Sequence, residues 1–211
     1  MCPYLGELLR ASKNAGLATM IVTNGSLITR SFLESNSGFI DWLALSIDSP
    51  SEETERVLGR GNGRHIERAI RAADLARGYG IRVKMNTVVT AINWQDDMAG
   101  IVSAINPQRW KVFQMLPILG ENDKSAPSLS VSLEQFRAFV ARHEFLNPVA
   151  EDNNDMLGSY VMLDPAARFF QNFNNEYAYS HSILEVGVEC ALSEVGWNSG
   201  KFYRRGGLYE W

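Results

Sequence analysis

The sequence predicts an α/β fold built on a parallel β-sheet. Short apolar segments of strand length alternate with segments of helical periodicity, and the strand centres lie roughly 25–40 residues apart, which suits strand–helix–strand units. The composition agrees with a packed domain, since 45% of the 211 residues are apolar and 21% are charged. A chain of this size is long enough to bury a hydrophobic core.

Four segments are predicted as strands because each is rich in aliphatic, β-branched or aromatic residues, as strands covered on both faces are. They are Ala18–Thr23, Trp42–Ile47, Ile81–Val89 and Arg109–Leu116. Four helices are predicted from apolar spacing and from capping or stop signals. They are Tyr4–Asn14, His65–Arg77, Gln95–Ile105 and Ser132–Glu144. The last of them opens with Ser132 and Gln135, which have the spacing of a capping box.

The rest of the chain is expected to be less regular. A short helix is predicted within residues 24–40, and Asn147–Asp155 is expected to be a polar loop. One more strand is predicted at Tyr160–Asp164 and a last helix at Ile183–Val195. Five aromatic residues between them indicate a small satellite core: Phe169, Phe170, Phe173, Tyr177 and Tyr179.

Composition and charge narrow the class of protein. The net charge of −4 argues against nonspecific binding to nucleic acid, which needs a basic surface. The chain has two cysteines, Cys2 and Cys190, too few for a disulfide framework, so a reducing compartment fits better. We find no apolar run of ~18 residues that would span a membrane and no uninterrupted apolar centre of a signal peptide. The expected location is the cytoplasm.

Polar residues follow the first two predicted strands, where ligands bind in parallel α/β folds. Asn24 and Ser26 are compatible either with a tight turn or with contacts to a ligand's hydroxyl or carboxylate groups. Alternation places Ser46 and Asp48 on the same side of their strand. A hydroxyl beside a carboxylate suits a ribose diol, although Asp48 is also a good helix cap.

Basic residues suggest a site for phosphate. Arg60 is flanked by glycines in GRGNG, which is not a P-loop but can bring a guanidinium and backbone amides to a phosphate. Lys84 and Lys111 lie inside apolar strands, where an unpaired lysine is costly to bury. Either they line a cationic hollow suited to a polyphosphate, or they pair with carboxylates. The three histidines show no metal-ligand spacing and are interpreted as structural.

Nine short stretches together resemble the viperin family of radical S-adenosylmethionine enzymes. In chain order they are VTNGSLI, LALSIDS, GRGNG, VKMNTVV, NPQRWKVFQ, LGEN, GSYVMLD, SILEVGVE and RRGGLYEW. The resemblance covers nearly the whole chain. It implies a partial (βα)₆ TIM-like radical SAM barrel, of which the chain holds the later four βα units in residues 1–125 and a C-terminal helix and extension in 126–211 that covers the nucleotide site.

The resemblance also implies a reaction. In the family, a [4Fe–4S] cluster held by three cysteines splits S-adenosylmethionine with an electron from a donor, and the resulting 5′-deoxyadenosyl radical takes a hydrogen from the ribose of a nucleoside triphosphate, usually CTP. Loss of the 3′-hydroxyl gives a 3′-deoxy-3′,4′-didehydro nucleotide, which terminates viral RNA chains. CTP is the expected substrate, and UTP and GTP remain open.

Site residues carry over from the family by position. Contacts to S-adenosylmethionine are expected from Asn24, Ser46 and Asp48. Contacts to the triphosphate are expected from Arg60, Lys84, Asn86, Arg109 and Lys111. Tyr160 matches the proposed hydrogen donor to the product radical. The tail Arg204–Trp211 is expected near the nucleotide, and His181 stands where the family has a basic residue.

The front of the family pattern is absent. The chain contains neither CxxxCxxC nor GGEP, and Cys2 and Cys190 cannot supply three clustered thiolates. We therefore expect a missing amino-terminal portion, no metal ligands in this chain and no radical activity from it alone. The alternatives are a non-catalytic short form that binds a nucleotide or a partner, and a radical enzyme that acts on another substrate such as a peptide.

Overall fold

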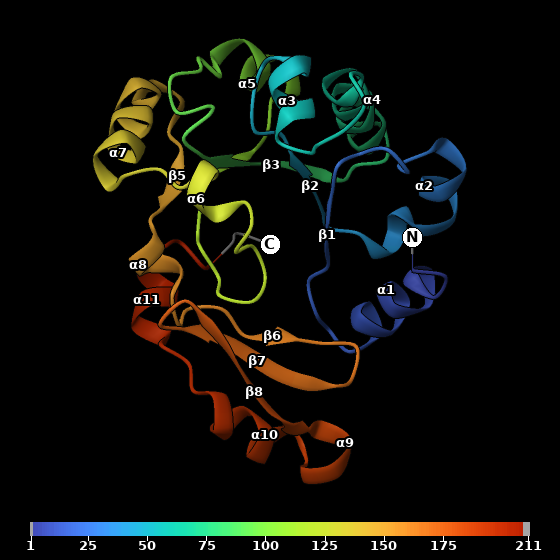
Figure 1. Cartoon of the computed structure of the whole chain (residues 1–211). Coiled ribbons are helices and arrows are strands. Elements are labelled where there is room, and N and C mark those ends of the chain that lie inside the picture. The colour runs from blue at the N-terminus through green and yellow to red at the C-terminus, as the bar shows by residue number, and fades with distance from the viewer. Residues whose placement is uncertain (1, 209–211) are drawn as a thin grey trace.

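The computed structural model describes residues 2–208 and confirms the predicted α/β fold with a parallel sheet. Five strands lie side by side in chain order, all parallel, and Figure 1 shows them as a curved sheet with helices around its outer side. The strands are β1 (Met20–Thr23), β2 (Trp42–Ser46), β3 (Arg82–Val89), β4 (Arg109–Gln114) and β5 (Val149–Glu151). The first four confirm the predicted strands.

The fifth strand corrects the sequence prediction, which placed a polar loop at Asn147–Asp155. β5 pairs with β4 from Val149, opposite Lys111, to Glu151, opposite Phe113. A strand of three residues is too short to show an alternating pattern. Its Glu151 is buried, although a glutamate in the sequence is more typical of an exposed loop. The parallel sheet therefore takes β1 to β4 from the part predicted as barrel, residues 1–125, and β5 from the part predicted as C-terminal extension, residues 126–211.

Helices follow most of the strands. Those before β5 are α1 (Leu5–Asn14), α2 (Arg30–Asn36), α3 (Glu52–Val57), α4 (His65–Gly78), α5 (Ala99–Ile105), α6 (Ala126–Leu129) and α7 (Leu133–Arg142), with 3₁₀ turns at Ser37–Phe39 and Glu144–Leu146. All four predicted helices are confirmed, although α5 begins four residues later than predicted. The predicted capping box of α7 is present, with the Ser132 and Gln135 side chains bonded to each other's backbone amides.

The hydrophobic core lies between the outer face of the sheet and the helices. Leu43, Leu45, Val83, Met85 and Val112 on the strands are completely buried. A row of small residues at helical spacing lets α4 lie close against them: Ala69, Ala72, Ala73 and Ala76. With one face of the sheet packed on helices, the side chains that alternate with this set point to the inner, concave face.

A small antiparallel sheet follows the parallel one. Its strands are β6 (Met162–Leu163), β7 (Arg168–Phe173) and β8 (Glu176–Ser182), and the short helices of this part are α8 (Asn153–Met156), α9 (Ile183–Val186), α10 (Val188–Val195) and α11 (Ser199–Arg204). The predicted strand at Tyr160–Asp164 corresponds to β6. The aromatic residues predicted as a satellite core lie on the β7–β8 hairpin, where the Phe170 ring contacts Tyr177 and Tyr179, but none of the five is buried. The predicted last helix is broken at Gly187, whose φ is +83°.

Candidate functional site: a cationic cluster on the concave face of the sheet

Strand register aligns the polar residues of the concave face in rows across the sheet. Ser46 on β2 is opposite Asn86 on β3, and Asn86 is opposite Lys111 on β4. One pair nearer the amino ends of the strands, Lys84 is opposite Arg109. Residues two apart on one strand share a face, so these five residues lie on the same concave face of the sheet. The structure therefore brings together five of the residues that the sequence singled out.

Glu151 on β5 is the negative centre of this face. Its side chain is fully buried, and it accepts a hydrogen bond from the Lys111 ammonium. The other carboxylate oxygen accepts from the Tyr160 hydroxyl at 2.5 Å, and the Arg205 guanidinium lies 3.3 Å from Oε1. The pairing of Lys111 with a carboxylate, one of the two readings of its sequence position, is confirmed, and its place among cations is consistent with the other.

The C-terminal segment closes over the same face. The Arg205 guanidinium stacks 3.7 Å from the centre of the Tyr160 ring and donates to the Ser159 carbonyl at 2.9 Å. Arg109 donates to the carbonyls of Gly206 and Leu208, so residues 206–208 lie against the amino end of β4. The tail was expected near the nucleotide site from Arg204 onward, and its last three residues lie outside the described ones.

Burial and mutual repulsion change the protonation of the lysines. Lys84, Arg109, Lys111 and Arg205 form what we call the cationic cluster. Burial lowers the pKa of Lys84 to about 8, and repulsion from Arg109 and Arg205 contributes to the shift. Burial also lowers the pKa of Lys111, as does repulsion from Lys84, Arg205 and Arg109. Because these four cations outnumber the one carboxylate among them, the cluster has the charge needed to bind a polyanionic ligand.

Two neutral side chains beside the cluster offer groups for hydrogen bonding to a ligand. Asn86 Oδ1 is buried and has no hydrogen-bond partner among the described residues. Burying an amide oxygen without a partner costs free energy, so such an atom points to a missing ligand or water. Ser46 is half-buried next to it, and no side-chain hydrogen bond of Ser46 is found in residues 2–208.

Asp48 and Arg60 form a second polar group at the carboxyl end of β2. The Asp48 carboxylate accepts from the Arg60 Nε at 2.5 Å and from the Val88 amide at 2.8 Å, and it is almost completely buried. Both residues line a cavity of about 420 Å³ that also borders the ends of β3 and β4. Since both oxygens of Asp48 are engaged by the protein, Arg60 is the charged group of this pair that reaches the cavity.

Asn24 occupies the turn after β1, at the same end of the sheet. Its Oδ1 accepts from the amide and hydroxyl of Ser26, and the side chain is exposed. The following Gly25 has a φ of +78°, and a Cβ there would lie 3.2 Å from Ala72 Cβ on α4. The turn therefore has a structural role of its own, and the structure shows no contact between Asn24 and the cationic cluster.

The sequence missed two residues of the site, Glu151 and Arg205. Glu151 stands in a stretch interpreted as a loop, and Arg205 was covered only by the general expectation for the tail. The family motif RRGGLYEW was the signal that could have indicated Arg205. His181, where the family has a basic residue, is exposed and pairs with Glu194 on α10.

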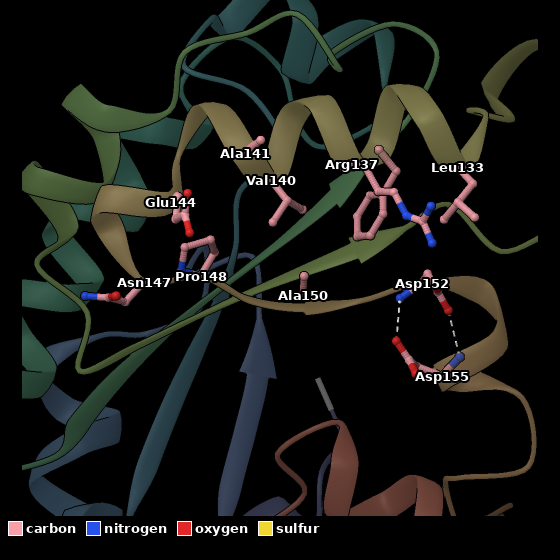
Figure 2. Close-up of a pocket in the computed structure, with 11 residues that line it drawn as sticks. Leu133, Arg137, Val140, Ala141, Glu144, Asn147, Pro148, Ala150, Asp152 and Asp155 are labelled. Atoms are coloured by element: carbon pink, nitrogen blue, oxygen red, sulfur yellow. Dashed lines mark hydrogen bonds between the residues drawn. The ribbon is translucent and has the colours of Figure 1, made fainter.

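A different hollow lies on the outer face of the sheet, between α7 and β5 (Figure 2). It measures about 520 Å³, and Ala150 lines it, whereas the next residue, Glu151, points to the concave face. Asp152 and Asp155 at its end bond to each other's backbone amides and so cap α8. This hollow is separate from the cationic cluster and holds none of the predicted site residues.

The described residues do not fit an iron–sulfur cluster. Cys2 and Cys190 are exposed and unpaired, and residues 2–208 contain no group of three or more His, Cys, Asp or Glu side chains that could hold a metal.

Comparisons with known proteins first define the class. A family model described as the radical SAM superfamily matches residues 2–99. Among solved structures, anSMEcpe with bound AdoMet aligns with a TM-score of 0.59 and 16% identity over 82% of this chain and 54% of its own. A domain of pyruvate-formate lyase-activating enzyme from Bacteroides vulgatus aligns with a TM-score of 0.52 and 10% identity over 71% of this chain and 89% of its own. The fold is that of a radical SAM enzyme.

Curated relatives define the family within that class. The S-adenosylmethionine-dependent nucleotide dehydratase of Flammeovirga pacifica is 44% identical over 100% of this chain and 74% of its own length, and that of Lacinutrix mariniflava is 40% identical over 100% and 45%. The Danio rerio enzyme of the same name is 38% identical over 99% and 61%. The chain belongs to the S-adenosylmethionine-dependent nucleotide dehydratases, the viperin family. It spans from about half to three quarters of the length of these relatives.

Proposed function

We propose that this chain forms the nucleotide-binding part of a nucleotide dehydratase that converts CTP to its 3′-deoxy-3′,4′-didehydro form in antiviral defence. The observation that carries the proposal is the buried cationic cluster on the concave face of the sheet. Such a concentration of positive charge is stabilised by a bound polyanion, and the curated relatives are named for action on nucleotides.

The triphosphate would bind to Lys84, Arg109, Lys111 and Arg205, with Arg60 reaching it from the carboxyl end of β2. Asn86, whose buried Oδ1 has no partner among the described residues, would accept a hydrogen bond from the nucleotide. Tyr160 is the proposed hydrogen donor to the product radical. Its hydroxyl is held by Glu151 at 2.5 Å, which fixes the orientation of the phenol before the nucleotide binds.

S-adenosylmethionine, which supplies the radical that starts the family reaction, would bind at the carboxyl ends of β2, β3 and β4. The cavity of about 420 Å³ lies there, with the Ser46 hydroxyl and the Asn24 turn at the same end of the sheet. Asp48, whose two oxygens are engaged by Arg60 and the Val88 amide, would orient Arg60 toward the triphosphate rather than touch S-adenosylmethionine. The iron–sulfur cluster does not fit the described residues, so its cysteines and an electron donor would come from elsewhere.

The protein is proposed to act in the cytoplasm. Across residues 2–208, the structure contains no helix with the length and apolar character needed to cross a bilayer. The exposed thiols of Cys2 and Cys190 agree with a reducing compartment.

Calorimetric titration with CTP tests the proposed site. We expect submillimolar binding to the full chain, weakened about tenfold or more in Lys111→Met, because a charge-assisted contact to phosphate is lost. Lys124→Met, at an exposed lysine, is the matched control and should bind like the wild type. Inorganic triphosphate should compete and cytidine should not. Absence of CTP binding by a folded, monodisperse protein would disprove the proposed function.

Anaerobic reconstitution with iron and sulfide tests the cofactor assignment. The chain as it stands is expected to form no 5′-deoxyadenosine from S-adenosylmethionine, because residues 2–208 lack three clustered thiolates. Nucleotide binding should persist in the same sample. Production of 5′-deoxyadenosine by this chain would show that the cluster is held in a way the structure does not indicate.

A further inference from the structure

The segment Ser46–Ser49, at the carboxyl end of β2, is held by side chains from several elements. The Ile47 carbonyl accepts from Thr87 Oγ1 at 2.7 Å, and the Asp48 carbonyl accepts from Asn93 Nδ2 at 2.6 Å. The backbone amides of Asp48 and Ser49 both donate to the same oxygen, Glu55 Oε1, each at 2.6 Å. Glu55 thus bonds directly to the two residues that end the segment.

Glu55 lies on α3 and is completely buried. Its second oxygen, Oε2, has no hydrogen-bond partner among the described residues and lies 3.5 Å from His65 Nε2. His65 Nε2 is in turn 2.8 Å from the Ser46 carbonyl, and the ring is also buried. Glu55 and His65 therefore hold the two ends of the same four-residue segment, and neither lines the cavity of about 420 Å³.

A buried carboxylate is a costly way to satisfy two backbone amides, since a serine or asparagine could do so without a charge. The segment it holds carries Asp48, whose carboxylate binds the Arg60 guanidinium, and Ser46, which lies beside Asn86. Arg60 and Asn86 are both assigned to the proposed ligands. The geometry of the site on β2 thus depends on a residue that contacts no ligand.

We propose that Glu55, supported by His65, is a positioning residue for the nucleotide site: it fixes the backbone of Asp48 and Ser49 and, through Asp48, the guanidinium of Arg60. The inference rests on the proposed function, because Arg60 is assigned there to the triphosphate. Glu55 does not itself touch the substrate or the cofactor.

Protonation of Glu55 adds a dependence on pH. Burial and, to a smaller extent, the Asp48 charge raise the pKa of Glu55 to about 7, against the opposing effects of the Ser49 and Asp48 amides and the Arg60 charge. The other ionisable groups around it are His65, Glu52, whose carboxylate binds the first amides of α4, and Asp96, which accepts from the Ser49 hydroxyl. A neutral Glu55 is a weaker acceptor for the two amides, so the hold on Arg60 should tighten as the pH rises through about 7.

Calorimetry with CTP at about pH 6 and about pH 8 tests the proposal with three variants of the full chain. Glu55→Ala should weaken binding about tenfold. Glu55→Gln keeps an acceptor and cannot titrate, so it should restore most of the affinity and lose the part of the pH dependence that the wild type shows through about pH 7. Glu53→Gln, exposed on the same helix, should match the wild type.

Hydrogen exchange at the Asp48 and Ser49 amides, resolved by NMR, gives a second readout that needs no ligand. Both amides should exchange faster in Glu55→Ala than in Glu55→Gln. If the wild type binds CTP and Glu55→Ala binds equally well, the positioning role is refuted and the proposed function stands. If the wild type binds no CTP, the proposed function fails. Unchanged exchange of the Asp48 and Ser49 amides in the Glu55 variants would then also refute the claim that Glu55 holds these amides. Should the alanine variant not fold, identical pH profiles of the glutamine variant and the wild type would refute the proposal.

Discussion

Replacing Glu151 with alanine is expected to destabilise the ligand-free protein by about 3–5 kcal/mol, the usual cost of leaving buried charges without their partner. The carboxylate is fully buried and bonds to Lys111, Arg205 and Tyr160. Removing it leaves the cations of the cluster to repel one another in a site from which water is largely excluded. Urea unfolding measures the loss, and Glu144→Ala, at an exposed glutamate that follows α7, is the control.

Two further measurements separate this explanation from a simple packing defect. Adding Lys111→Met to Glu151→Ala should recover part of the stability, because the lysine that lost its carboxylate partner is removed. Saturating CTP should stabilise the Glu151 variant more than the wild type, since the triphosphate supplies the missing negative charge. A loss below about 1 kcal/mol, typical of an exposed ion pair, would contradict the buried ion-pair network.

The stability of the ligand-free protein is expected to rise between about pH 8 and pH 10, with Lys84 as a principal cause. An unfolded lysine keeps its proton up to about 10.5, whereas burial lowers the pKa of folded Lys84 to about 8. Between these values the unfolded chain binds more protons than the folded one, so the free energy of unfolding increases with pH. Lys84→Met should flatten this rise and leave stability near pH 7 unchanged or improved.

The affinity for CTP should change in the opposite direction over the same range. A triphosphate favours the charged form of Lys84, so binding above pH 8 requires uptake of a proton, and affinity should fall by up to about tenfold per pH unit. The phosphate groups themselves titrate near pH 6, below this window. Calorimetry in buffers of different ionisation enthalpy would detect the proton uptake. A pH-independent affinity in the wild type, or the same decrease in Lys84→Met, would exclude Lys84 as the group responsible.

The cations of the cluster are already held in place by protein groups before a nucleotide binds. In the absence of nucleotide, Glu151 holds Lys111 and Tyr160 in place, and residues 206–208 of the tail hold Arg109. A triphosphate would compete with Glu151 and with the tail carbonyls for these cations. Part of the free energy of binding would therefore be offset by breaking these contacts, in exchange for side chains already oriented toward the hollow.

The sequence by itself determined the strands that carry the site. Lys84 and Asn86 alternate along one predicted strand and Arg109 and Lys111 along another, and side-chain alternation in a strand depends only on local backbone geometry. The same local information predicted the capping box at Ser132 and the amphipathic face of α4. The order of the family motifs, including the segment with Tyr160, was also legible without coordinates.

Only the tertiary structure decided which charges meet. Glu151 pairs with Lys111 across 40 positions of the chain and with Arg205 across 54, and no local pattern carries such a pairing. β5 has three residues, too few for a periodic signal. The polar stretch that contains it, with Glu151, was therefore interpreted as a loop. Glu55 was hidden in the same way, because a glutamate on a short helix is normally exposed, and its burial against the amides of Asp48 and Ser49 exists only once β2 and α3 are packed together.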